Sequence, residues 1–101
     1  MVVNIDNATN RIIYNRILRE CRKLLMQTVF EFNDDYTRED ISVKIKALLN
    51  RAKTHAIKDY TYTILDYDRA KPHYIEIHIA LLFKNKINQV LIHLNNVDSN
   101  L

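Results

Sequence analysis

Apolar residues follow a helical spacing in the first half of this chain and strict alternation from residue 60 onward. In segments 10–27 and 38–52 they recur three and four positions apart, as on one face of a helix. In the segments 60–65, 73–83 and 89–94 they occupy every second position, which is the period of a strand with one buried face. This change of period predicts an α+β fold, in which two amphipathic helices pack on a three-stranded antiparallel sheet.

The first predicted helix runs from about Asn10 to Gln27 with Thr9 as its N-cap, and the second runs from about Arg38 to Ala52. Thr37 with Asp40 three residues later forms a variant of the capping box before the second helix. The expected buried stripes are Ile13, Ile17, Cys21, Leu24 and Leu25 on the first helix and Ile41, Ile45, Leu48, Leu49 and Ala52 on the second.

The three strands are expected to form a meander, connected by the polar segments 66–72 and 84–86. The longest strand should bury Ile75, Ile77, Ile79, Leu81 and Phe83, and the last should bury Val90, Ile92 and Leu94. Residues 1–8 suit a strand-forming arm, because Met1–Ile5 is short and β-branched. Residues 95–101 are polar and suit a flexible tail. An arm or a neighbouring chain could extend the sheet to four or more strands.

A chain of 101 residues, 48% of them hydrophobic and 27% charged, is expected to fold as a single domain spanning 1–101. There is no glycine, so Asn, Asp, Lys and Thr must build the turns. Cys21 is the only cysteine, which excludes an internal disulfide, and we expect it to be buried. We expect neither a secretion signal nor a membrane span, because no apolar run approaches about 18 residues.

Catalytic, cofactor-binding and metal-binding residues are not predicted. A phosphate-binding loop needs glycine, and no serine or exposed cysteine stands in a nucleophile motif. Glu76, His78 and His93 fall on the polar side of the strands, where a solvated cross-strand ladder is a better interpretation than a metal site. The acidic residues Asp34, Asp35, Glu39 and Asp40 surround a helix start, where negative charge is favourable. We therefore expect a protein that is not an enzyme.

A small nucleic-acid-binding module is the alternative function that the residues allow. The net charge is +3, and Arg11, Arg16, Arg19, Arg22 and Lys23 share the polar face of the first helix. Tyr60, Tyr62 and Tyr74 could stack on bases if they were exposed on the sheet. Half-buried tyrosines and a solvated arginine face are the more ordinary interpretation.

The segment 29–38 is similar to a pattern of contractile phage tail sheath proteins, Val-Phe-Glu-x-Asn-Asp-x-x-Thr/Leu-Arg before an apolar helix. The residues that carry this resemblance are Phe30, Glu31, Asn33, Asp34, Thr37 and Arg38. Residues 11–25 resemble the preceding sheath helix, and residues 57–60 resemble the family's entry into its first strand. The likeness covers about residues 10–94 and concerns the C-terminal (inner) domain of the sheath.

The outer sheath domains have no counterpart in the sequence, so the chain resembles a stand-alone sheath initiator of the baseplate. The resemblance implies a structural virion protein, assembled in the host cytoplasm, that docks the first sheath ring. It implies contacts with sheath subunits, baseplate wedge and tail tube proteins and copies of itself in a ring, and no small-molecule substrate. Docking in this family uses inter-subunit strand addition, for which we expect Val2, Val3, Ile5, Val90, Ile92 and Leu94. Pairing of Met1–Ile5 within its own subunit is the competing interpretation.

Overall fold

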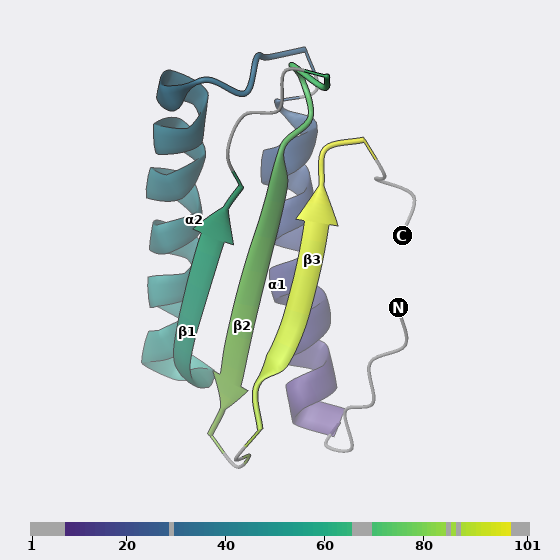
Figure 1. Ribbon diagram of the computed structural model, residues 1–101. Coiled ribbons are helices and arrows are strands. Elements are labelled where there is room, and N and C mark those ends of the chain that lie inside the picture. Colours follow the sequence, from purple (N-terminus) through teal and green to yellow (C-terminus); the bar gives the residue numbers. More distant parts are fainter. Residues whose placement is uncertain (1–7, 29, 66–69, 85, 87, 98–101) are drawn as a thin grey trace.

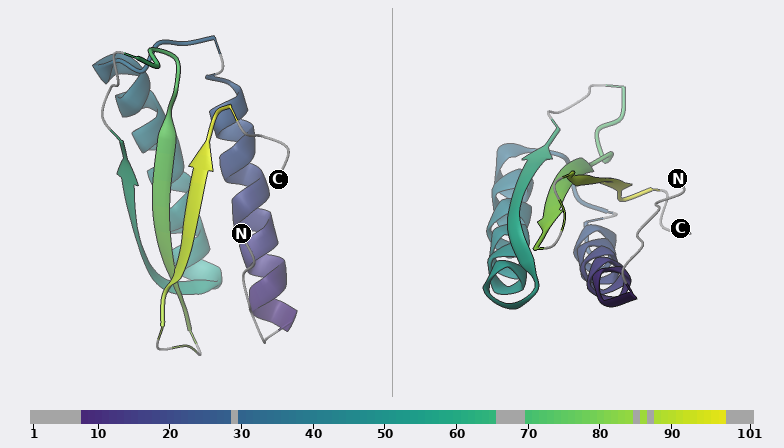
Figure 2. Two further views of the ribbon diagram at one scale, coloured as in Figure 1. Left: turned by 45° about the vertical axis from the view of Figure 1, so that its right-hand side comes forward. Right: turned by 90° about the horizontal axis from the view of Figure 1, so that it is seen from below.

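The chain forms two layers, a three-stranded antiparallel sheet and two helices on one of its faces (Figures 1 and 2). The computed structural model describes residues 8–28, 30–65, 70–84, 86 and 88–97. The elements are α1 (Ala8–Met26), α2 (Asp35–His55), β1 (Ile57–Ile64), β2 (Glu76–Phe83) and β3 (Val90–Asn95), and the sheet order is β1-β2-β3. The predicted α+β fold, with its meander of strands, is therefore confirmed.

Both predicted helix starts are wrong. Thr9 lies inside α1, because the helix already begins at Ala8. The N-cap of α2 is Asp34 rather than Thr37, and its Oδ1 accepts a hydrogen bond from the Thr37 main-chain N–H at 2.8 Å. Asp and Thr are both good N-caps. Capping at Asp34 adds residues 35–37 to the helix. Thr37 is then a buried residue of the first turn of α2.

The core is formed by the inward face of the sheet and by one stripe of each helix. Ile75, Ile77, Ile79, Leu81 and Phe83 are 0–1% exposed, and Ile92 and Leu94 of β3 are also buried, as the alternation predicts. The helices contribute chiefly Ile17, Cys21, Leu25, Ile41, Ile45 and Leu49. Tyr14 replaces the predicted Ile13 at a buried position of α1, since Ile13 is only half-buried.

The second face of the sheet has no layer of described residues over it. Alternation places Thr61, Thr63, Glu76, His78, Ala80, Leu82, Leu91 and His93 on this face, and all are half-buried or exposed. In Figure 2 both helices lie on the opposite side of the sheet, with α2 near β1 and α1 near β3. The sheet therefore presents an open face and two edge strands.

The predicted strand-forming arm, residues 1–8, lies outside the described residues except for Ala8, which begins α1. The predicted tail is described as far as Val97, and its first residues are ordered parts of the fold. Asn95 ends β3, and Asn96 is 1% exposed. No described helix is long and apolar enough to cross a membrane.

Two buried asparagines connect the end of the sheet to the connection between the helices. Asn96 Oδ1 accepts from the Ile75 N–H at 2.9 Å, and its Nδ2 donates to the His73 carbonyl at 2.7 Å. Nδ2 also lies 3.3 Å from Thr28 Oγ1. Asn33 donates its main-chain N–H to the Pro72 carbonyl at 2.8 Å and its Nδ2 to the Tyr74 carbonyl at 3.0 Å. These bonds satisfy main-chain groups of residues 72–75, which make no hydrogen bonds within a described strand ladder.

Replacing Asn96 by alanine is expected to lower the free energy of unfolding by about 2 kcal/mol, because the Ile75 N–H would stay buried without its acceptor. Urea denaturation of Asn96→Ala measures this as a lower midpoint at an unchanged slope. Asn88→Ala, at an exposed position, is the control. Equal midpoints for the two variants would contradict the role given to Asn96.

Candidate functional site

The outer edge of β3 carries main-chain groups that no described strand pairs. The Asn96 N–H donates to the Ile75 carbonyl at 3.1 Å, which shows that residue 96 faces β2. Main-chain groups point to the same side at every second residue, and β3 pairs with β2 without a register shift. The N–H and C=O groups of residues 90, 92 and 94 therefore face β2. Those of Leu91, His93 and Asn95 face outward.

The residues expected for strand addition have different positions in the structure. Val90, Ile92 and Leu94 place their side chains toward the core, and their main chain is directed to β2. Val2, Val3 and Ile5 lie outside the described residues. The main-chain groups available to an incoming strand belong to residues 91 and 93. Apolar alternation could not indicate them, because it reports which side chains are buried and not which amides are paired.

The motif that resembles the sheath pattern builds the connection between α1 and α2. Arg38 Nη1 donates to the Asn33 carbonyl at 3.0 Å and to Asn33 Oδ1 at 2.8 Å, while Nη2 pairs with Asp35. Asn33 and Thr37 are buried, and Asp34 caps α2. Four of the six motif residues thus have a structural explanation within the chain.

The remaining two motif residues project outward. Phe30 is 90% exposed, and the Glu31 side chain is also exposed. The Glu31 carbonyl lies 2.8 Å from His73 Nδ1, and the His73 ring stacks on Phe32 with centroids 4.4 Å apart. The connection is therefore attached to the loop before β2 and presents Phe30 from a supported backbone.

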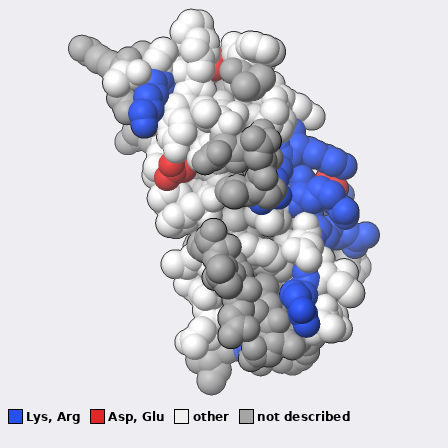
Figure 3. Space-filling model, turned by 90° about the vertical axis from the view of Figure 1, so that its right-hand side faces the viewer, with Lys and Arg blue, Asp and Glu red and all other residues white. Residues whose placement is uncertain are grey.

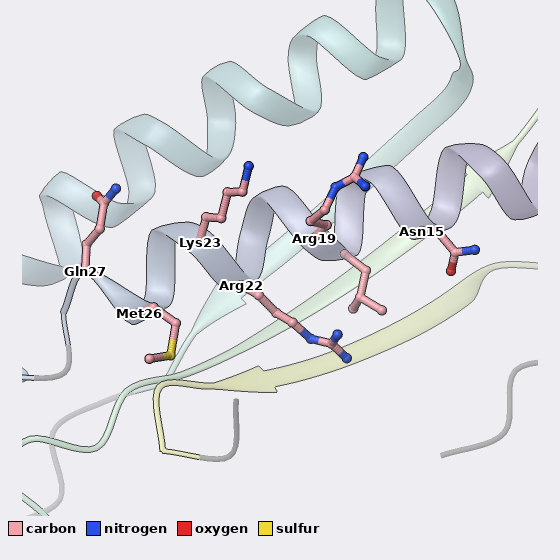
Figure 4. A pocket seen from close by; sticks show the side chains of 7 residues that line it. Asn15, Arg19, Arg22, Lys23, Met26 and Gln27 are labelled. Atoms are coloured by element: carbon pink, nitrogen blue, oxygen red, sulfur yellow. The ribbon is translucent and has the colours of Figure 1, made fainter. Parts of the chain in front are cut away.

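A groove of about 630 Å³ runs along the outer side of α1. It is lined by Asn15, Leu18, Arg19, Arg22, Lys23, Met26 and Gln27. In Figure 4 Arg22 and Met26 extend from α1 on the side of β3, and Arg19 and Lys23 extend on the other side. Figure 3 shows Lys and Arg side chains gathered on one part of this face of the molecule. Its lining combines the apolar Leu18 and Met26 with the cationic Arg19, Arg22 and Lys23.

The histidines of the open face form a stacked pair across two strands. His78 and His93 face each other in the register of β2 and β3, with ring centroids 3.9 Å apart. His78 Nε2 lies 2.5 Å from Glu76 Oε2, and the Tyr74 hydroxyl also donates to Glu76. The Tyr74 and His78 hydrogen bonds hold the pKa of Glu76 below its ordinary value. Among the described residues no group of three or more His, Cys, Asp or Glu could hold a metal ion.

Tyr60, Tyr62 and Tyr74 do not form an exposed stacking surface, since all three are half-buried. The Tyr60 hydroxyl donates to Asn50 Oδ1 at 2.5 Å, and the Tyr62 hydroxyl lies 2.7 Å from Ser42 Oγ, so both side chains bridge β1 to α2. Tyr74 is bonded to Glu76, and Lys71 Nζ lies 5.0 Å from the centre of its ring. This arrangement fits the half-buried interpretation of these residues.

Cys21 is buried in the core, as expected, with no exposed surface. Burial raises the pKa of its thiol to about 12, and the nearby Glu20 carboxylate contributes to this shift. The thiol is therefore protonated near neutral pH, and it is a packing residue rather than a nucleophile.

Comparisons with models of protein families, with curated proteins and with solved structures found no match to this chain. The features of the molecule that bear on function are the edge of β3 and the basic face of α1.

The cap of α2 predicts a pH dependence of stability. Hydrogen bonds from the main chain and side chain of Thr37 lower the pKa of Asp34 from its ordinary value of 3.8. The stabilisation from this carboxylate is therefore complete above pH 3.8 and is lost as the pH falls through the lower pKa of the folded state. Asp34→Asn keeps a good N-cap without this titration.

The loss of stability between about pH 5 and about pH 2 should therefore be smaller in Asp34→Asn than in the wild type. Denaturant unfolding across this range measures the difference. Glu39→Gln, which removes an exposed carboxyl from the same helix, is the matched control. Parallel profiles for the wild type and Asp34→Asn would show that the cap does not depend on the charge.

Proposed function

We propose that this chain is a structural virion protein of a contractile tail, which docks the first sheath ring to the baseplate by inter-subunit β-strand addition. The observation that carries the proposal is the outward-facing main chain of Leu91 and His93 on β3, which no described strand pairs. An extended segment from a sheath subunit would supply the missing hydrogen bonds and become the fourth strand. The resemblance of segment 29–38 to the sheath pattern supports the choice of this partner.

The edge at β3 is better suited to this role than the edge at β1. The pairing of β1 with β2 shifts register between Ile57 and Asp59, and such irregularities discourage the addition of a further strand. β3 pairs with β2 in continuous register over its whole length. We therefore assign docking of the sheath strand to β3, with baseplate wedge, tail tube and neighbouring copies of the chain around it in the particle.

The role we propose is not enzymatic. The cysteine thiol is buried and protonated, and the cross-strand histidines are engaged with each other and with Glu76. The surface instead carries a strand edge that can pair with another chain and a cationic groove. Both features suit an assembly protein.

The basic face of α1 is the main observation in favour of the alternative function, nucleic-acid binding. Tyr60 and Tyr62, the side chains that would stack on bases, are instead hydrogen-bonded to α2. Sequence-tolerant binding of single strands generally combines a basic groove with exposed aromatic rings. We therefore place the docking function first.

Leu91→Pro is expected to abolish docking and preserve the fold. Leu91 is 56% exposed, and its N–H faces the free edge, so proline there removes a docking hydrogen bond without breaking the pairing with β2. Light scattering and electron microscopy of sheath polymerisation, seeded by the protein from the same tail system, measure docking. Leu91→Thr keeps the N–H and is the control.

Circular dichroism of Leu91→Pro should match the wild type. Sheath subunits that polymerise at the same rate and into the same structures with and without the wild-type protein would refute the docking function. Full seeding by Leu91→Pro would refute the assignment to the edge of β3.

A further inference from the structure

The charges of the chain are separated into two adjoining surfaces at the C-terminal end of α1. α1 carries five basic residues and one acidic residue, whereas the segment 31–40, which follows it closely, carries five acidic residues and one basic residue. Within the acidic segment Asp35 pairs with Arg38, Asp40 pairs with Lys44 and Asp34 caps α2, so Glu31 and Glu39 are the carboxylates that remain for a partner. Lys23 and Glu20 lie 3.7 Å apart at exposed positions, where an ion pair contributes little. The chain is thus complementary in charge to a second copy of itself.

The basic surface contains a recess for an apolar side chain. Leu18 is half-buried and Met26 is 42% exposed, and both line the groove together with the exposed side chains of Arg19 and Lys23. The recess, of about 630 Å³, is open to solvent along the helix rather than enclosed. In addition, Arg22 Nε is buried without a hydrogen-bond partner among the described residues. The groove therefore suits an apolar group that is accompanied by negative charge.

The acidic surface presents such a group. Phe30 is 90% exposed and Tyr36 is 81% exposed, and Glu31 lies next to Phe30. The backbone that presents them is held in place, since the Glu31 N–H donates to the Thr28 carbonyl at 2.9 Å and the Asn33 N–H donates to the Pro72 carbonyl. A supported backbone loses little conformational entropy when it binds. The rings of Phe30 and Tyr36, which are flanked by carboxylates, can therefore bind in the cationic groove of α1.

We propose that two copies of this chain associate reciprocally, with Phe30 and the acidic residues 31–40 of each copy seated in the α1 groove of the other. The two surfaces adjoin on the same molecule, so one two-fold axis satisfies both contacts and closes the assembly as a dimer. This contact uses neither edge of the sheet, and it can form or fail independently of strand addition at β3.

Sedimentation analysis should detect a dimer, twice the 12.0 kDa of the chain, at low ionic strength. Because exposed charges are screened by salt, the association constant should fall at least about tenfold between about 0.05 M and about 0.5 M salt. Phe30→Ser should abolish the dimer without changing the circular dichroism spectrum. Protein that stays monomeric at high concentration and low salt would overturn the proposal.

A reciprocal charge exchange tests the pairing itself. Arg19→Glu/Lys23→Glu makes the groove acidic, and Glu31→Lys/Glu39→Lys makes the opposing surface basic, so each double variant alone should be monomeric. An equimolar mixture should regain association, because each groove then meets a surface of opposite charge. Lys46→Glu/Lys58→Glu has the same change in net charge as the first variant at exposed positions outside the groove, and it should remain dimeric.

Absence of association in the mixture would overturn the proposed contact, as would loss of the dimer in the Lys46→Glu/Lys58→Glu control. Monomeric wild-type protein that instead binds a single-stranded oligonucleotide through α1 would also overturn it, and would assign the basic surface to nucleic acid.

Discussion

Burial of one face of β2 is the constraint on which the rest of the structure depends. Five side chains between Ile75 and Phe83 are almost fully buried, and each removes apolar surface from water that favours folding by about 2 kcal/mol. Two helices are enough to cover this face, and they leave the opposite face to Glu76, His78 and Leu82. Because β2 is central, β1 and β3 are the edge strands. The surfaces available for assembly follow from this arrangement.

The polar end of the molecule gives the residues between Asn33 and Arg38 a structural role. Asn33 joins the helical connection to the segment before β2, Arg38 supports Asn33, and Asp34 caps α2. Asn96 makes equivalent bonds from the end of β3 to Thr28 and to residues 73 and 75. Removing either amide would leave buried main-chain groups without partners, so these residue types are required by the fold.

The β3 edge and the α1 groove offer two physically different modes of association. Strand addition at β3 uses main-chain hydrogen bonds, which vary little with ionic strength and accept many sequences. The groove uses charge and an aromatic side chain, which make recognition selective and dependent on salt. A protein of a multi-subunit particle can use the first for a permanent link and the second for a reversible contact.

The sequence by itself determined the kind and order of the elements and the buried faces of β2 and β3. Side-chain periodicity is a local property, and the apolar positions mark which side of a strand is buried. Only the tertiary structure decided that Asp34 rather than Thr37 caps α2, and that Tyr60 and Tyr62 face Asn50 and Ser42. It also showed that the amides of residues 91 and 93 point away from β2. These features depend on contacts between residues that are far apart in the sequence, as Thr28 and Asn96 are. A local sequence pattern cannot predict which distant residues will be in contact.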